Sequence, residues 1–238
     1  MAFLKEVSAG TPRLNQLTPA FVRLIGRPWE LPADKDKGYS ALAAESWLKR
    51  LGSGRTFAPP TGKVGPALAL LHGSSTGPDQ MAHYYLRLQL HAGQWQVDHF
   101  VVSSAALEVD LPEEEAALTA GFALQCWLAA LADRQVLAPE DRAVLAAALL
   151  TPALRQQWAP PFDSDRAHGY DFNRGQLLLR LEPFSSAQRR FHLRPLDPPR
   201  HWQIEALLDK ATSKRWVLML EKMDDTPQWL ITRLQETP

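Results

Sequence analysis

Two polar residues at matching positions stand on an otherwise apolar strand pattern and could do chemistry, His99 and Arg233. An imidazole can act as a base and a guanidinium can anchor an anion. The structural alternative is that each reaches solvent at a strand end, or that His99 is a hydrogen-bonded core histidine. Asp98 and His99 do not form a catalytic pair in this pattern, because neighbours on a strand point to opposite faces.

A serine within residues 70–77, LLHGSSTG, suggests a different chemistry. The segment from Gly73 to Gly77 matches the G-x-S-x-G nucleophile elbow and follows a short apolar strand. An elbow needs a helix directly after the serine, whereas Pro78 leads within a few residues into another strand pattern. We therefore interpret the match as accidental. A serine hydrolase built on Ser75 stays as a second alternative, which labelling by a fluorophosphonate probe would revive.

Composition excludes several classes of function. The 238 residues have a formal net charge of zero and no long Lys/Arg run, which argues against nucleic-acid binding and against a polybasic membrane anchor. The single Cys126 excludes an internal disulfide and a cysteine zinc cage, and it fits a buried, inert thiol. The seven histidines are scattered and no Gly-rich loop opens a helix, so we expect no metal and no cofactor.

Hydropathy gives no sign of a membrane protein. The longest purely apolar run, residues 144–150, is too short to span a bilayer. The first residues, MAFLKEV, lack the apolar core of a signal peptide. The compartment therefore stays open between the cytoplasm and export with the signal segment absent from this chain.

Residues 83–104 predict a hairpin around which the rest can be placed. Ala92-Gly93 suits a two-residue turn, since Gly supplies a positive φ. The pairing then puts on one apolar face the pairs Leu90/Trp95, Leu88/Val97, Leu86/His99 and Tyr84/Val101. The other face carries a cross-strand Arg87/Asp98 pair among polar residues and is predicted to be largely wet.

Four sequence matches recur in the same order at offsets of 131 to 134 residues. They are Leu17-Thr18-Pro19-Ala20 with Leu150-Thr151-Pro152-Ala153, Gly38-Tyr39 with Gly169-Tyr170, Leu86 and Leu88 with Leu218 and Leu220, and Gln94-Trp95 with Gln228-Trp229. We interpret the chain as one unit written twice. The first copy then lacks most of a first helix, which indicates a domain truncated in nature or a chain that was cut.

The order of elements predicts an α+β fold. Predicted helices begin at Pro19 and cover residues 41–51, 112–135, 139–150 and 152–158. Predicted strands cover residues 67–72, 83–91, 94–104, 176–182, 190–194, 201–208, 216–222 and 228–235, and residues 73–79 are expected to turn. We place one domain at residues 1–105, a linker and helix start at 106–118, and a second domain at 119–238.

Each half ends in a long hairpin of the form aromatic-L-x-L … G-x-W-x-V/I, and the endings YYLRLQLHAGQWQVDHFVVSS and WVLMLEKMDDTPQWLITRLQE carry this likeness. This resembles the nuclear transport factor 2-like cone fold, which ketosteroid isomerase-like and SnoaL-like polyketide cyclase-like proteins share. The resemblance implies two tandem cones, each of N-terminal helices packed on a curved antiparallel sheet, often with a pocket between. The second copy departs from it, with a strand-like GQLLLRLEPF in place of the 41–51 helix.

The resemblance also gives candidate site residues. An isomerase of this family would use Tyr and Asp to stabilise an enolate and move a proton. Asp171 follows Tyr170, but no acid accompanies Tyr39, and a packing role explains both tyrosines. We take His99, Arg233, Tyr39 and Tyr170 as candidate pocket residues and assign no catalytic residue.

Two functional hypotheses follow. The first is a non-catalytic tandem module that binds a small apolar ligand or a protein partner. The alternative is an isomerase- or cyclase-like enzyme acting on a small organic substrate through His99 or Asp171. A dimer through the sheet faces is a further expectation, while nucleic acid and membrane partners are not expected.

Overall fold

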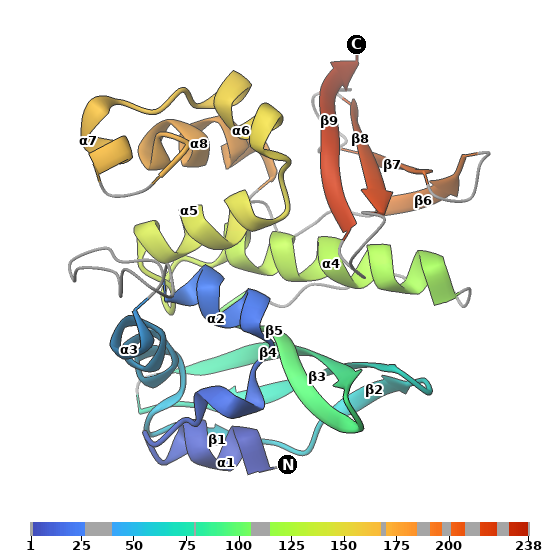
Figure 1. Cartoon of the computed structure of the whole chain (residues 1–238). Helices are drawn as coiled ribbons and strands as arrows, with labels where there is room; N and C mark the ends of the chain where they lie inside the picture. Colours follow the sequence, from blue (N-terminus) through green and yellow to red (C-terminus); the bar gives the residue numbers. More distant parts are fainter. Residues whose placement is uncertain are drawn as a thin grey trace. The chain divides into compact units, whose positions relative to one another are not determined.

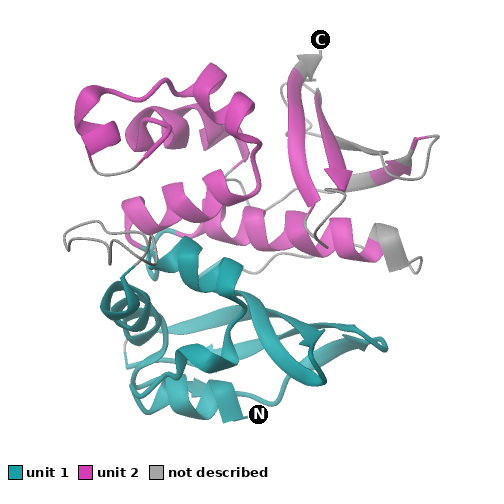
Figure 2. Cartoon of the chain, in the orientation of Figure 1, with its two compact units in different colours: residues 1–105, 134–137 teal, residues 106–133, 138–238 magenta. Residues whose placement is uncertain are grey.

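A computed structural model of the chain divides into two compact units (Figure 2). Unit 1 comprises residues 1–105 and 134–137, and unit 2 comprises residues 106–133 and 138–238. The structure describes residues 2–26, 40–78, 80–105, 115–167, 170–184, 191–196, 201–207, 215–222 and 229–237. Tyr39 lies outside these described residues, as do residues 106–114 at the expected linker. Both units combine helices with an antiparallel sheet, so the chain has the α+β fold that the sequence predicts.

Unit 1 places its helices before its sheet in the sequence (Figure 1). The helices are α1 (Ala2–Ser8), the 3₁₀ turn η1 (Leu14–Gln16), α2 (Pro19–Ile25) and α3 (Ala41–Gly52). The strands are β1 (Thr56–Phe57), β2 (Thr61–Val64), β3 (Leu68–Thr76), β4 (Met81–His91) and β5 (Gln94–Ser103). Phe3 of α1 and Phe57 of β1 both pack edge-on against Phe100 of β5, at ring-centroid distances of 5.3 and 6.2 Å. These aromatic contacts join helices and sheet into one core.

Unit 2 follows the same order with more helices. They are α4 (Glu115–Ala132), α5 (Pro139–Ala148), α6 (Pro152–Trp158), α7 (Asp163–Ala167), α8 (Arg174–Leu181) and the 3₁₀ turn η2 (Glu182–Phe184). The strands are β6 (Phe191–Pro195), β7 (His201–Leu207), β8 (Arg215–Lys222) and β9 (Trp229–Thr237). Phe184 anchors the core, with ring centroids 5.4 Å from Trp127 and 4.9 Å from Trp216.

The two sheets have closely related pairing. In unit 1, β3, β4 and β5 pair antiparallel in sequence order, and β1 and β2 both pair with β3. In unit 2, β6, β7, β8 and β9 pair antiparallel in sequence order. Leu68 of β3 pairs with Gln89, and His201 of β7 pairs with Glu221, which keeps the register of the recurring segments. The pairing of β2–β5 is thus repeated by β6–β9.

The hairpin of β4 and β5 forms as predicted at its turn but not along its whole length. Ala92 and Gly93 both have positive φ, 48° and 77°, as a type I′ turn requires. A register shift between Arg87 and Leu88 leaves Asp98 as a bulged residue, so Arg87 pairs with His99 and Leu86 with Phe100. The predicted single apolar face is therefore wrong beyond the bulge.

The expected environment of the Arg87/Asp98 pair is also wrong. Instead of a wet face, both side chains are buried, with exposed fractions of 8 and 4 %. Trp95 and Leu90, predicted to face the core, are 42 and 38 % exposed near the turn. Leu90 and Trp95 still pair with each other as predicted, so their exposure comes from their place near the turn and not from the bulge. Farther from the turn both faces of the hairpin are covered, since Leu86 and Arg87 point to opposite faces and both are buried.

Two predicted segments take another form. Residues 176–182 are predicted as a strand but are helical: residues 176–181 belong to α8 and Glu182 begins η2. The N-cap of α8, Asn173, accepts a hydrogen bond from the Gln176 N–H at 2.8 Å. A run of three leucines is compatible with a buried strand and with a helix, and here the Asn173 cap favours the helix. Residues 73–76 were expected to turn but extend β3. Gly73 is required there, because a Cβ would stand 2.7 Å from the Tyr84 hydroxyl.

The helix starts also recur between the units. Thr18 caps α2 by accepting from the Phe21 N–H, and Thr151 caps α6 by accepting from the Leu154 N–H. The Thr18 N–H donates to the Val97 carbonyl at 2.8 Å, and the Thr151 N–H donates to the Ile231 carbonyl at 3.1 Å. In both units a threonine therefore starts a helix and ties it to the last strand.

Among the residues that the structure describes, no helix combines the length and the apolar character needed to cross a bilayer.

Candidate functional site

An open hollow of about 670 Å³ lies in unit 2. Its lining residues are Gln156, Pro160, Pro161, Arg166, Tyr170 and Asp171. We call it the α6–α7 hollow, because Gln156 lies on α6 and Arg166 on α7. A volume in this range suits a small organic ligand.

The chain folds into this shape because α6 stops abruptly. Pro160 and Pro161 follow the helix, and neither has an N–H with which to continue it. The loop that begins there closes on itself, since the Asn173 N–H donates to the Ala159 carbonyl at 2.8 Å. Inside the loop, one oxygen of Asp165 accepts from the Phe162 N–H and from the Asn173 side chain. A single buried carboxylate thus holds both ends of the hollow's wall.

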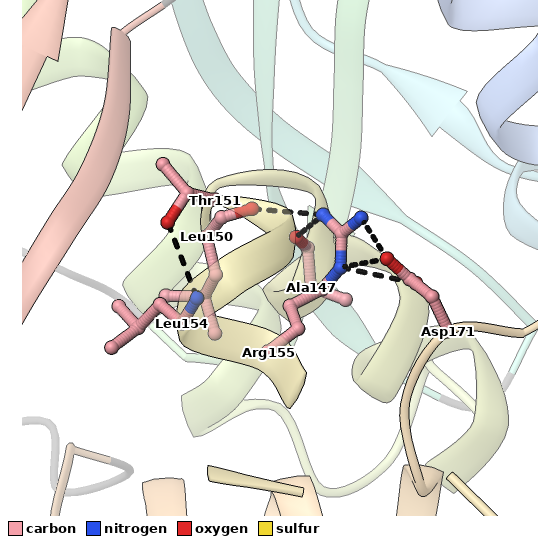
Figure 3. A network of polar contacts seen from close by, with 6 residues as sticks. All are labelled: Ala147, Leu150, Thr151, Leu154, Arg155 and Asp171. Atoms are coloured by element: carbon pink, nitrogen blue, oxygen red, sulfur yellow. Dashed lines mark hydrogen bonds and ion pairs between the residues drawn. The ribbon is translucent and has the colours of Figure 1, made fainter. Parts of the chain in front are cut away.

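Arg155 holds the lining residue Asp171 in place (Figure 3). Its Nε donates to both oxygens of Asp171 at 3.2 Å, and its Nη2 donates to Oδ2 at 2.6 Å. Its Nη1 donates to the carbonyls of Ala147 and Leu150 at 3.1 and 2.8 Å. These carbonyls lie at the end of α5, where helical acceptors have no partner in the helix. Arg155 therefore caps α5 and holds the Asp171 carboxylate in place.

Tyr170 forms the buried part of the hollow. It is 2 % exposed and packs edge-on against Phe172 at 5.7 Å. The Arg174 guanidinium lies 4.9 Å from the centre of the Tyr170 ring, within the range of a cation–π contact. Its ring is thus held from two sides, and it offers the hollow a rigid aromatic edge.

Arg166 differs from the other cations of this region. It is exposed, and among the described residues it makes no ion pair within 4.0 Å. Arg155 and Arg174, in contrast, are paired with Asp171 and Asp165 at 2.6 and 3.9 Å. The positive charge on Arg166 is therefore available to a ligand in the hollow.

The polar residues of unit 1 form a different kind of cluster, around the bulge of β5. Arg87 Nη2 lies 2.6 Å from Asp98 Oδ2, and the Thr18 hydroxyl donates to Asp98 Oδ1 at 3.3 Å. His99 Nε2 is buried without a hydrogen-bond partner in the described part of the chain, and its ring lies 5.8 Å from that of Phe21. Burial, and then the charge of Arg87, lower the pKa of His99 to about 4, while Asp98 opposes the shift.

Two hydroxyl groups of unit 1 with catalytic potential, those of Ser75 and Tyr84, are buried or occupied. Ser75 is 1 % exposed and lies within β3, paired with Ala82 across the sheet, so no strand-to-helix elbow surrounds it. The Tyr84 hydroxyl donates to the Ala58 carbonyl at 2.7 Å, and burial raises its pKa to about 12. Neither hydroxyl is placed to reach a substrate.

The candidate pocket residues that the structure describes belong to different units. His99 is partly exposed on β5 in unit 1, whereas Arg233 is exposed on β9 in unit 2 and pairs with Met219 in the sheet register. Tyr39 lies outside the described residues. Tyr170, and with it Asp171, lines the α6–α7 hollow. Sequence reasoning did not select Gln156, Pro160, Pro161 or Arg166, although the proline pair was a visible sign of a sharp stop.

Within the described ranges, no group of three or more His, Cys, Asp or Glu side chains is placed to hold a metal ion. Cys126 is buried as a free thiol. The chemistry available at the site is thus that of a guanidinium, an amide, a paired carboxylate, an aromatic edge and two proline rings.

Fold and site together define an α+β protein with antiparallel sheets and an open polar hollow in its second unit. No family model matches the chain, and no curated protein matches it. A crystal structure of a cystatin-like protein from Ruminococcus gnavus ATCC 29149 is similar at 10 % identity and a TM-score of 0.23, covering 100 % of this chain and 90 % of that chain. A TM-score this low carries no argument about this protein.

Proposed function

We propose that the protein is a non-catalytic module that binds a small organic ligand in the α6–α7 hollow. The observation that supports this most is the hollow itself, with its proline wall, buried Tyr170 ring and available Arg166. Small-molecule sites combine such apolar walls with a few polar groups that orient the ligand.

The enzyme hypothesis has less support from the same contacts. Asp171 lines the hollow, but both of its oxygens accept hydrogen bonds from Arg155. A general base must be within reach of a substrate proton and able to accept it, and a carboxylate held by a guanidinium fork is poorly suited to that role. His99, the other proposed base, belongs to unit 1 and has its Nε2 buried.

We also infer that the chain contains two copies of one helix-and-sheet module, of the kind the nuclear transport factor 2-like resemblance implies. The inference is supported by the matched sheet registers, the threonine caps and the bulges at Asp98 and Thr232. A shared loop closure supports it further. The Ser40 N–H donates to the Gly26 carbonyl in unit 1, and the Asn173 N–H donates to the Ala159 carbonyl in unit 2.

The test is a fragment screen on the whole ¹⁵N-labelled chain, read as amide chemical-shift changes. Fragments should shift the amides of the α6–α7 hollow, and the variant Gln156→Trp, which fills the hollow, should abolish the shifts. Gln157→Trp is the matched control, because Gln157 is exposed on the same helix and does not line the hollow. The proposal fails if fragments bind elsewhere only, or if Gln156→Trp leaves their binding unchanged.

A second arm addresses catalysis directly. The intact chain should form no adduct with a fluorophosphonate probe, because the Ser75 hydroxyl is buried in a strand. A stoichiometric adduct that Ser75→Ala removes would contradict the non-catalytic proposal and restore the hydrolase.

A further inference from the structure

The charges around the α6–α7 hollow do not cancel. Asp171 is compensated by the fork from Arg155, and Asp165 by its hydrogen bonds and by Arg174 at 3.9 Å. Arg166 has no such partner in the described part of unit 2, although it lies three residues from Asp163 on the same helix. The lining therefore carries one uncompensated positive charge, on an exposed side chain.

The other lining groups favour a flat apolar body beside that charge. Pro160 and Pro161 present ring surfaces, and Tyr170 presents an edge that its neighbours hold rigidly. Gln156 contributes an amide that can donate or accept. A guanidinium matches a carboxylate with two parallel N–H donors, which a single ammonium or hydroxyl group cannot reproduce.

We propose that the ligand of the α6–α7 hollow is a carboxylate attached to a ring or other flat apolar group, with Arg166 as the anchor of the carboxylate. This rests on the proposed function, since it names the ligand class of the same site. Arg166 is exposed, so its contribution is that of a surface ion pair and corresponds to about a two- to fivefold gain in affinity. The gain should shrink as salt is added.

The experiment compares three probes of one shape: benzoate, benzamide and benzylamine, titrated into the ¹⁵N-labelled whole chain at low salt. Benzoate should bind about two- to fivefold more tightly than benzamide, with benzylamine weakest. In Arg166→Gln, benzoate and benzamide should bind equally. Arg180→Gln is the control, because Arg180 is an exposed arginine of α8 that does not line the hollow.

A gain-of-affinity variant keeps the test independent of damage to the fold. Asp163→Asn removes the nearest uncompensated negative charge of α7 and should strengthen benzoate binding without changing benzamide. If benzoate and benzamide shift the same hollow amides with equal affinity, the carboxylate class is wrong while the proposed function stands. If benzylamine binds best, Asp171 is the determinant and the assignment to Arg166 is overturned. If none of the three probes shifts these amides but other fragments do, the carboxylate class is wrong and the proposed binding function stands. If no fragment binds in the α6–α7 hollow, both proposals are wrong.

Discussion

Both units contain an arginine–aspartate pair with an N–O distance of 2.6 Å, but the two pairs stand at different points of similar frameworks. In unit 1 the pair is Arg87–Asp98, buried across the bulge between β4 and β5. At the corresponding bulge of unit 2, Met219 and Thr232 take these places, and the Thr232 hydroxyl donates to the Met219 carbonyl. In unit 2 the pair is Arg155–Asp171, at the end of α5 and the edge of the hollow.

Comparing the two bulges shows which features the sheet framework requires and which are particular to one unit. Both bulges form, one beside a charge pair and the other beside a methionine and a hydroxyl, so the backbone irregularity does not depend on the ion pair. A buried ion pair is costly to desolvate and is often replaceable by apolar groups of similar volume. The Arg155–Asp171 pair, in contrast, is partly exposed and lies where a ligand can reach it.

The largest expected effect comes from breaking the buried pair of unit 1. Arg87→Met or Asp98→Thr alone should lower the free energy of unfolding of the chain by about 3–5 kcal/mol, because each leaves one buried charge without its partner. The double variant Arg87→Met/Asp98→Thr installs the pair found in unit 2 and should recover most of that loss. Urea denaturation of the four proteins at neutral pH measures both effects.

The coupling energy between Arg87→Met and Asp98→Thr tests whether the methionine and threonine of unit 2 can replace the ion pair of unit 1. Two single losses that simply add would mean that the bulge of unit 1 requires the charges, and that Met219 and Thr232 are not a valid replacement. The control is Met81→Leu, made in the natural chain and in the double variant Arg87→Met/Asp98→Thr. Met81 is 66 % exposed, so this change should leave the free energy of unfolding unaltered in both backgrounds.

Arg155 should give the next largest effect, about 2–3 kcal/mol for Arg155→Met. The change removes the side-chain donor to Asp171 and to the carbonyls of Ala147 and Leu150, although the Ala147 carbonyl still accepts from the Leu150 N–H at 3.1 Å. Part of this region is solvated, and water replaces some of the lost bonds. Arg155→Lys should recover only part of the loss, since an ammonium cannot form the fork. A loss below about 0.5 kcal/mol, the range of exposed ion pairs, would contradict this interpretation. Denaturation beside Arg180→Met, an exposed arginine on α8, provides the measurement and its control.

The sequence was sufficient for much of the framework and insufficient for the site. Thr-Pro pairs, Gly at a turn and strand alternation have local physical causes, so α2, α6 and the Ala92-Gly93 turn follow from them. The bulge at Asp98 has no such local signal. It depends on which register buries more side chains across the sheet, and a misplaced bulge reverses every face beyond it.

The hollow depends on contacts distant along the chain. Tyr170 is a candidate because Gly169-Tyr170 repeats Gly38-Tyr39 in the sequence. The loop closures at Ser40 and Asn173 instead set an offset of 133, which aligns Phe172 with Tyr39. Tyr170 lines the hollow because α6 ends before Pro160-Pro161 and because Asp165 holds the following loop. No spacing in the sequence reports that Arg166 lacks a partner, because pairing is decided by the fold.

The pH dependence of stability distinguishes the units further. The pKa of His99 is lowered to about 4 in the folded protein, so the unfolded chain binds the additional proton between about pH 6.5 and 4. The contribution of His99 is complete above about pH 6.5 and is lost as pH falls through that window. We expect a loss of about 1–3 kcal/mol, smaller than full burial would give because the side chain is partly exposed.

The measurement is the free energy of unfolding at pH 7 and at pH 4.5, in the natural chain and in His99→Leu. The variant should lose less stability on acidification than the natural chain, while His72→Leu, at an exposed histidine of β3, should not differ from it. An NMR titration that returned an ordinary pKa for His99 would show that its ring is solvated, and the difference between the variants should then vanish.

The smallest effect tests the two threonine caps against each other. Thr151→Ala should cost about 1 kcal/mol, the usual value for a lost N-cap. Thr18→Ala should cost about 1–2 kcal/mol more, because the Thr18 hydroxyl also donates to the buried carboxylate of Asp98. That excess should disappear when Thr18→Ala is made in the Arg87→Met/Asp98→Thr background, where residue 98 no longer carries a carboxylate. Equal costs in the natural background would show that the Thr18–Asp98 contact at 3.3 Å adds nothing, and that the two caps differ only in their surroundings.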